Sequence, residues 1–254
     1  MTLYDYPEYY EIAFSFRNVP EEARFMQSCI QRFSRIPVRR VFEVACGYAP
    51  HAEELIKLGY KYTGLDNNRN MIDYASHKWH DLKPAPKFIE SNMLSFSSRR
   101  KVDFGFVMLG SLYLNSLEEM NAHFDSIAGI LRSGGLYFLD WCIQFGDPLK
   151  YATSSSMINK LDGITVESKF NIRLVDSANQ MYEEVWTVNV DDHGRQKRFE
   201  VTERNRAIFP QEFLLFIRSR TDFEFVGWWQ DWDLSKPISG QANANRPVAL
   251  VIRK

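Results

Sequence analysis

The first 142 residues alternate between short β-rich runs and segments with helical spacing, and this alternation restricts the fold more than any other feature. Parallel strands need long crossover connections, which helices supply, so the pattern predicts a largely parallel sheet covered by helices on both faces. The expected elements are, in order, a helix at 20–33, a strand at 40–46, a helix at 52–58, a strand at 60–65, a helix at 70–79, strands at 87–89 and 102–109, a helix at 117–131 and a strand at 135–142.

The pattern changes after residue 142. Three alternating β-rich segments follow at 164–175, 181–190 and 197–207, and a turn at Asp191-Asp192-His193-Gly194 separates the last two. Alternation broken by such turns is typical of antiparallel strands. A helix at 210–219 and strands at 223–229 and 248–253 then return the chain to the first sheet.

These patterns together predict an α/β fold. We expect a Rossmann-like, mostly parallel sheet of seven strands with an antiparallel C-terminal hairpin, and an antiparallel β lid inserted after the fifth strand. The corresponding division is a main domain of residues 1–142 and 208–254 with an N-terminal cover, and a lid of residues 143–207.

Composition narrows the possible classes of function. Lys and Arg total 31 against 32 for Asp and Glu, so the formal charge of −1 creates no general attraction to nucleic acid or anionic lipid. The cysteines Cys29, Cys46 and Cys142 are widely spaced, which indicates neither a disulfide framework nor a zinc site, and no metal is expected. The polar N-terminus and the lack of a long apolar run predict a soluble, unprocessed cytoplasmic protein.

Two residues stand at the ends of the first two expected strands. Gly47 follows the first strand, where a backbone turn can pass close beneath a ligand, and Asp66 ends the second, where a carboxylate can accept hydrogen bonds from both ribose hydroxyls. Taken singly, a glycine after a strand is more often a plain turn residue, and an aspartate there is more often a helix cap. The glycine series of nicotinamide dinucleotide sites is missing, because positions 47, 49 and 52 are Gly, Ala and Ala.

The surroundings of Gly47 and Asp66 form an ordered series of motifs. The series is Glu43-x-x-Cys46-Gly47, then Gly64-Leu65-Asp66-Asn67-Asn68 with Met71, then Ser91-Asn92-Met93, then the strand from Asp103 to Leu109, then Leu131-Arg132-Ser133-Gly134-Gly135. Over residues 40–142 it resembles class I S-adenosylmethionine (SAM)-dependent methyltransferases.

This resemblance implies a role for each motif. The loop at residues 45–47 would pass under the methionine part of SAM and Asp66 would hold the ribose. Asn67 and Met71 would pack against adenine, and Asn92 and Met93 would recognise its edge. The complete set of expected cofactor-binding residues is Tyr9, Arg17, Glu43, Ala45, Cys46, Gly47, Asp66, Asn67, Met71, Asn92, Met93 and Leu109.

The N-terminal segment is unusually aromatic, reading Tyr4-Asp5-Tyr6-Pro7-Glu8-Tyr9-Tyr10. It resembles the lead-in of small-molecule methyltransferases, which folds over the cofactor. Our hypothesis is that Tyr9 or Tyr10 covers the cofactor and that Arg17 pairs with its carboxylate, since a guanidinium matches that group bidentately. The alternative is an aromatic arm that only packs on the core.

Methyl transfer from an activated donor needs alignment, and it needs a general base only where the acceptor holds a proton. No residue is therefore identified as catalytic. Tyr113 and Trp141 lie at the carboxyl ends of the fourth and fifth strands and are expected to shape an acceptor pocket, with simple packing as the alternative. His51 and His123 are expected to be polar surface residues.

The β-rich segment resembles the lid of glycine-type and sugar-amine N-methyltransferases, and the resemblance implies that it roofs the acceptor. Strand alternation puts Glu203 and Asn205 on one face and Arg204 and Arg206 on the other, with the inward face left open. We predict methyl transfer from SAM to nitrogen or oxygen of a small molecule, without a nucleic-acid or membrane partner. The alternatives are a SAM-binding protein without turnover and a nicotinamide-dependent oxidoreductase.

Overall fold

A seven-stranded sheet forms the centre of the protein, whose computed structural model describes residues 2–151, 156–240 and 244–254. The strands lie in the order β10-β11-β5-β4-β1-β2-β3. Strands β1 to β5 are mutually parallel, and β11 runs antiparallel to β5 and β10. Their bounds are β1 (Arg40–Val44), β2 (Lys61–Asp66), β3 (Lys87–Glu90), β4 (Val102–Val107), β5 (Leu131–Asp140), β10 (Phe223–Trp229) and β11 (Val248–Arg253). The predicted Rossmann-like α/β fold is confirmed.

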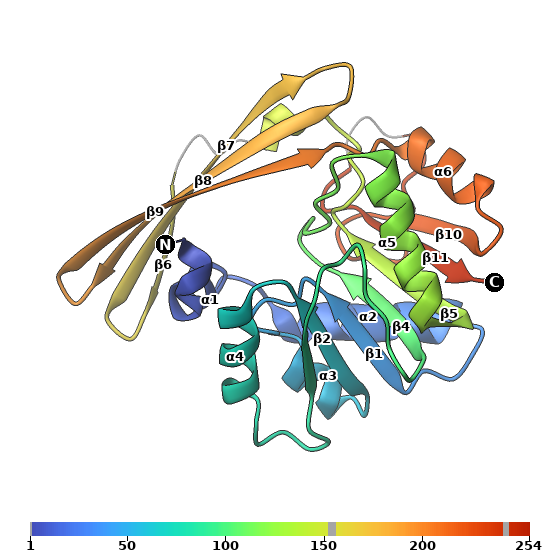
Figure 1. Ribbon diagram of the computed structural model, residues 1–254, viewed down its shortest axis with the longest axis horizontal. Coiled ribbons are helices and arrows are strands. Elements are labelled where there is room, and N and C mark those ends of the chain that lie inside the picture. The colour runs from blue at the N-terminus through green and yellow to red at the C-terminus, as the bar shows by residue number, and fades with distance from the viewer. Residues whose placement is uncertain (1, 152–155, 241–243) are drawn as a thin grey trace.

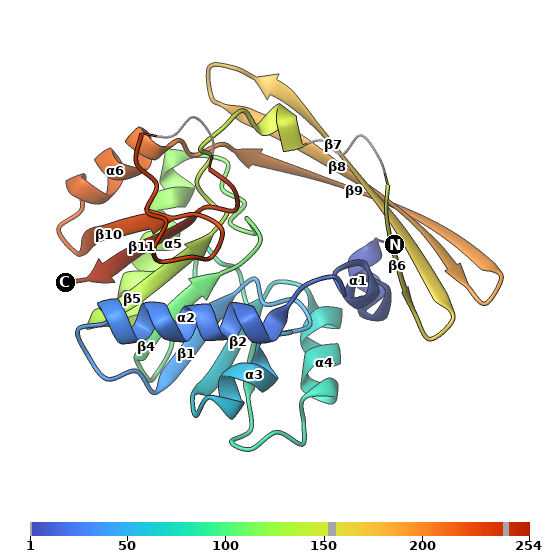
Figure 2. The ribbon, with the colours of Figure 1, turned by 180° about the vertical axis from the view of Figure 1, so that it is seen from behind.

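Helices cover both faces of this sheet (Figures 1 and 2). One face packs against α2 (Val19–Phe33), α3 (Ala52–Lys57) and α4 (Arg69–Lys78), and the other against α5 (Leu117–Ile130) and α6 (Pro210–Ser219). All six residues of the central strand β4 are buried, as expected for a parallel strand covered on both sides. Helices α4 and α5 begin where short polar side chains accept backbone N–H groups, as Asn68 does from Met71 and Ser116 does from Glu119.

A second, four-stranded antiparallel sheet, the lid, lies between β5 and α6 in the chain. Its strands are β6 (Met157–Leu161), β7 (Ile164–Asp176), β8 (Met181–Asp192) and β9 (Arg195–Arg206). The sequence predicted three of these strands and their place in the chain. Strand β6 was missed because it is a short edge strand whose residues are half-buried or exposed, so it lacks a clear hydrophobic alternation.

The N-terminal arm packs against the lid and not only against the main sheet. It consists of the short 3₁₀ helix η1 (Leu3–Asp5) and helix α1 (Pro7–Ala13), which lies beneath the long strands of the lid in Figure 1. Arm and lid share one apolar cluster, whose buried members are Leu3, Tyr9, Ile12, Ala13, Val166, Trp186, Val188, Val190, Phe199 and Val201. A further 3₁₀ helix, η2 (Pro148–Tyr151), precedes the lid.

The two faces of the lid differ in what covers them. We call the side that carries Trp186 and Val201 the inner face, because it packs against the arm. Alternation places Glu203 and Asn205 on this inner face, while Arg204 lies on the outer face, where it pairs with Glu183. The structure therefore answers the question that the sequence left open.

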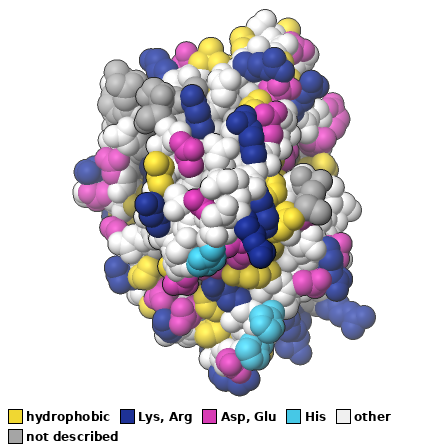
Figure 3. All heavy atoms as spheres, turned by 90° about the vertical axis from the view of Figure 1, so that its left-hand side faces the viewer, with side chains coloured by type: hydrophobic (Ala, Val, Ile, Leu, Met, Phe, Trp, Pro, Cys, Tyr) yellow, Lys and Arg dark blue, Asp and Glu magenta, His cyan; other side chains and the backbone are white. Residues whose placement is uncertain are grey.

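Charged side chains on the surface are mixed. On the side of the molecule shown in Figure 3, basic and acidic side chains are interspersed over the surface. Among the helices of the described residues, none is long and apolar enough to cross a membrane.

Candidate functional site

The loop after β1 has a strained backbone. Ala45, Gly47 and Ala49 have φ angles of +52°, +53° and +56°, in the left-handed region that side chains with a Cβ seldom adopt. The loop is held from two sides, because the Trp79 Nε1–H donates to the carbonyl of Tyr48 over 2.9 Å and the Cys46 side chain packs closely on β2. Strain that the surroundings maintain in this way is typical of ligand-binding backbone.

Gly47 and Asp66 are in direct contact at the carboxyl edge of the sheet. The Gly47 N–H donates to Asp66 Oδ2 over 2.8 Å, and the Asn68 N–H donates to Oδ1 over 2.9 Å. Burial raises the pKa of this half-buried carboxyl group, although the backbone donors act in the opposite direction. Each carboxylate oxygen has two lone pairs, so each can still accept a hydroxyl hydrogen bond, which fits the two hydroxyls of a ribose.

The residues expected near adenine lie along the same edge. Met71 is buried in the first turn of α4, Asn67 is exposed, and Met93 is half-buried. The side-chain oxygen of the exposed Asn92 already accepts the backbone N–H of Leu94 over 2.8 Å. It therefore retains one lone pair for a further donor.

Tyr9 and Tyr10 point to different partners, although they are neighbours in α1. The Tyr9 hydroxyl donates to Asp192 over 2.9 Å and accepts from Lys197 over 2.6 Å, so it binds the lid. The Tyr10 ring lies against the glycine loop, since a Cβ added to Gly47 would stand 3.9 Å from its Cε1. Of the two alternatives for a cofactor cover, the geometry favours Tyr10.

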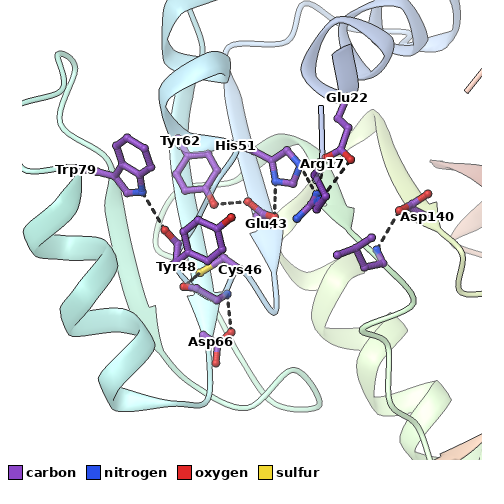
Figure 4. Close-up of polar contacts among 12 residues, drawn as sticks. Arg17, Glu22, Glu43, Cys46, Tyr48, His51, Tyr62, Asp66, Trp79 and Asp140 are labelled. Carbon is purple, nitrogen blue, oxygen red and sulfur yellow. Dashed lines mark hydrogen bonds and ion pairs between the residues drawn. The ribbon is translucent and has the colours of Figure 1, made fainter. Parts of the chain in front are cut away.

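His51 is completely buried, and the prediction that it lies on the surface was wrong. Its Nδ1 lies 2.8 Å from Glu43 and its Nε2 lies 2.9 Å from Glu22 (Figure 4). Burial lowers the pKa of His51, but the two carboxylates outweigh it and the net pKa is raised. The imidazole, held between two carboxylates, fixes the start of α3 against β1 and α2.

Glu43, which the sequence predicts as a cofactor-binding residue, does not face an open surface. It is 2% exposed, and its two oxygens are used by His51 and by the hydroxyl of Tyr62. We assign it to the shape of the glycine loop.

Arg17 is also bound within the protein. Its Nη2 lies 2.5 Å and its Nε 3.3 Å from the carboxylate of Glu22, and Arg246 reaches the same carboxylate over 2.7 Å. Burial raises the pKa of Glu22, but His51 and Arg17 outweigh it, so the net pKa is well below its usual range. The Nε and Nη2 atoms of Arg17 are thus occupied by Glu22, and Nη2 also lies 3.0 Å from His51 Nε2. The pairing of Arg17 with a cofactor carboxylate stays a hypothesis.

His123 is the second histidine whose predicted exposure was wrong. It is completely buried on α5, with Nδ1 2.9 Å from the Met93 carbonyl and Nε2 2.8 Å from the Tyr137 hydroxyl. Burial lowers its pKa to about 4, so the ring is neutral at pH 7. A neutral ring donates to the carbonyl and accepts from the hydroxyl, which satisfies both nitrogens inside the core.

Leu109 and Trp141 follow β4 and β5 at the same edge of the sheet as Gly47. Both have left-handed backbone, with φ of +55° and +59°. The Leu109 N–H donates to Asp140 Oδ2 over 3.0 Å, whereas Oδ1 of this buried aspartate has no hydrogen-bond partner among the described residues.

Tyr113, further along the loop after β4, donates from its hydroxyl to Glu184 of the lid over 3.2 Å. The predicted pocket residues thus lie where the sheet and lid approach.

Sequence reasoning missed the polar partners that hold the loop in place. Glu22, Tyr62 and Arg246 come from α2, β2 and the segment before β11, and each reaches the same buried cluster. A glutamate on an amphipathic helix and a tyrosine in a strand carry no local signal of such a role. In the described part of the chain, no three His, Cys, Asp or Glu side chains are grouped to hold a metal ion.

Comparisons with known proteins agree with this geometry. Residues 41–135 match the family model described as a methyltransferase domain. A protein of Geobacillus sp. (strain WCH70), named as a methyltransferase, is 28% identical over 117 residues. That match covers 46% of this chain and 47% of the relative, so the chain spans about half the length of the curated relative that it matches.

Solved structures are similar over almost the whole chain. A SAM-dependent methyltransferase from Clostridium acetobutylicum ATCC 824 has a TM-score of 0.78 at 15% identity, covering 96% of this chain and 95% of that one. A SAM-bound amino pentose methyltransferase from Micromonospora echinaspora has a TM-score of 0.72 at 16% identity, covering 94% and 92%. The fold is that of these solved SAM-dependent methyltransferases, and residues 41–135 are similar to a methyltransferase domain, in agreement with the resemblance drawn from the motifs.

Proposed function

We propose that this protein transfers a methyl group from SAM to a nitrogen or oxygen atom of a small molecule. The observation that carries the proposal is the contact between Gly47 and Asp66, which brings a bent backbone and a ribose-binding carboxylate to one point at the carboxyl edge of the sheet. Ligands of open α/β folds bind at this edge. We assign the cofactor to residues 1–142 and 208–254, and the acceptor to the lid at residues 143–207.

The residues proposed to hold the cofactor divide by position. Gly47 with Ala45 and Cys46 would lie beneath the amino-acid tail, Asp66 would bind the ribose, and Tyr10 would cover the bound molecule. The remaining proposed contacts are Asn67, Met71, Asn92, Met93, Leu109 and Arg17.

The chain's own residues mainly align the reactants and exclude water. SAM, when bound, would supply an activated methyl group on a positively charged sulfur. The aromatic arm and the lid shield the glycine loop, which favours methyl transfer by keeping competing water away. Tyr113 and Trp141 would shape the acceptor side.

Calorimetry with S-adenosylhomocysteine (SAH) tests the cofactor assignment. We expect SAH to bind and NADH not to bind. Asp66→Asn should weaken SAH binding at least tenfold, because a hydrogen bond to a charged group contributes about 1.5–3 kcal/mol. Asp73→Asn, a change on the exposed side of α4, is the matched control and should bind SAH like the unaltered protein. No heat with SAH, or equal heats with SAH and NADH, would refute the proposal.

Transfer of label from methyl-labelled SAM to a metabolite panel separates an enzyme from a binding protein. Labelled product is expected from the unaltered protein. SAH binding without any labelled product would favour the alternative of a cofactor-binding protein without turnover.

A further inference from the structure

Two carboxylates face each other on the inner face of the lid. Glu184 in β8 and Glu203 in β9 are directly opposite in the strand register. Like charges in that position repel each other and destabilise a sheet. In the described part of the chain, neither carboxylate forms an ion pair, whereas Glu183 on the outer face pairs with Arg173 and Arg204. The inner pair therefore has no basic partner among the described residues.

A tyrosine hydroxyl contacts this pair of carboxylates. The Tyr113 hydroxyl donates to Glu184 Oε2 over 3.2 Å. Burial raises the pKa of both Glu184 and Glu203, and the repulsion from Glu203 adds to the shift at Glu184. The pKa of Tyr4 is raised first by burial and then by Tyr10, Glu203 and Asp66 among its neighbours. The carboxylate pair thus lies on the same side of the lid as the residues assigned to the cofactor.

A second observation on the same face points independently to a ligand. Trp186 lies two residues along β8 from Glu184, so both side chains project from the inner face. Trp186 is 6% exposed, and within the described residues its indole Nε1–H has no hydrogen-bond partner. A buried donor without an acceptor is costly, and a ligand oxygen would satisfy it.

We propose that the methyl acceptor is an amine, bound as its ammonium ion by Glu184 and Glu203, oriented by Tyr113 and placed so that Trp186 donates to an oxygen atom of the same molecule. The inference rests on the proposed methyl transfer and names the acceptor class of that site. An ammonium ion placed between two opposed carboxylates removes their repulsion and gains charge-assisted hydrogen bonds. The nearby aromatic rings add a cation–π attraction.

The same carboxylates prepare the amine for reaction. An ammonium ion has no lone pair, so the nitrogen must first lose one proton, and Glu184 or Glu203 is the base that accepts it. The carboxylate becomes a neutral carboxylic acid and the amine becomes a neutral nucleophile, with atoms and charge conserved. The other carboxylate stays ionised and pairs with the methylated ammonium product.

Thermal melting of the ligand-free protein tests whether repulsion between Glu184 and Glu203 destabilises the protein when no cation is bound. Glu203→Gln removes the repulsion and is expected to raise the melting temperature by about 1–3 °C. Glu183→Gln, on the outer face of the same strand pair, breaks two ion pairs and is expected to lower the melting temperature. A lower melting temperature for Glu203→Gln would overturn the inference, because the pair would then be stabilised from within the protein.

Binding to the SAH-saturated protein tests the amine itself. Glucosamine and glucose differ by an amine in place of one hydroxyl, and we expect glucosamine to bind at least tenfold more tightly. Glu203→Gln should remove this preference, while Glu183→Gln should retain it and both variants should bind SAH normally. Equal responses to the two sugars, including no response to either, overturn the inference.

The two proposals fail in different ways. Absence of SAH binding by the unaltered protein contradicts the proposed function. Normal SAH binding without an amine preference contradicts only the assignment of Glu184 and Glu203.

Discussion

At the scale of single residues, Asp140 has the most costly environment in the site. It is completely buried at the end of β5, one of its oxygens has no hydrogen-bond partner among the described residues, and Arg246 Nε lies 3.8 Å away. Burial raises its pKa to about 6, although Arg246 and the Leu109 N–H act to lower it, and Glu22 and Arg17 also influence it. The folded state therefore binds this proton more tightly than the unfolded chain.

This pKa predicts how stability changes with pH. An unfolded aspartate titrates near pH 4, so the folded protein loses stability as the pH rises from about 4 to about 6. Asp140→Asn removes that loss. The free energy of unfolding of this variant, relative to that of the unaltered protein, should therefore increase by about 2–3 kcal/mol between pH 4 and pH 7. Urea unfolding at pH 4.5, 6 and 7.5 measures the difference. Asp73→Asn is the exposed control, and an advantage of Asp140→Asn that does not change with pH would contradict the prediction.

Gly47 and Asp66 could be predicted from the sequence because their roles are local to two strand ends. His51 and His123 could not, because the groups that make burial favourable are distant in the chain. Glu22 precedes His51 by a whole helix and strand, and Tyr137 lies on a strand after the helix that carries His123. Neither pairing leaves a local pattern, so a histidine at a helix start resembles a surface residue.

At the scale of elements, the N-terminal arm joins the lid to the glycine loop. Tyr9 binds Asp192 and Lys197 of the lid, Asn159 of β6 donates to the Ala13 carbonyl over 3.0 Å, and Tyr10 on the same helix lies against Gly47. The strands β7 to β9 were predictable because alternation is a local signal. The helical conformation of the arm was not, because its aromatic residues are buried mainly by a sheet that comes 150 residues later.

Substitution of the two tyrosines separates these contacts. Tyr10→Ala should weaken SAH binding about tenfold or more, because it removes a ring that covers the glycine loop. Tyr9→Phe should leave the SAH dissociation constant unchanged. It should increase the rate of hydrogen exchange about tenfold in α1 and at the β8–β9 turn, because each lost hydrogen bond contributes about 1 kcal/mol to local stability. Calorimetry and exchange mass spectrometry measure the two effects. The reverse result, with Tyr9→Phe weakening SAH binding and Tyr10→Ala not, would assign the cover to Tyr9.

At the scale of the whole molecule, two sets of contacts among the described residues help to attach the lid to the main sheet. One is the arm, and the other is Leu114, whose carbonyl accepts the Arg206 N–H over 2.9 Å and whose N–H donates to Asn205 over 3.3 Å. Figure 1 shows the lid spanning the main sheet between the arm and the region of α5 and α6. A ligand at the glycine loop lies beside the arm, so we infer that its binding energy stabilises the lid as well.

This coupling predicts a common response to SAH. A ligand that binds only the folded state, present at 100 times its dissociation constant, adds about 2.7 kcal/mol to the free energy of unfolding. For a chain of this size, that raises the melting temperature by about 5–10 °C. Far-UV circular dichroism should show this higher melting temperature, and protection from hydrogen exchange should increase in β8 and β9 as well as in β1 and β2. In Tyr9→Phe, where the arm is loosened from the lid, the rise in β8 and β9 should be smaller while β1 and β2 respond fully. If SAH protects only the main sheet in the unaltered protein, the lid unfolds independently and the coupling through the arm is refuted.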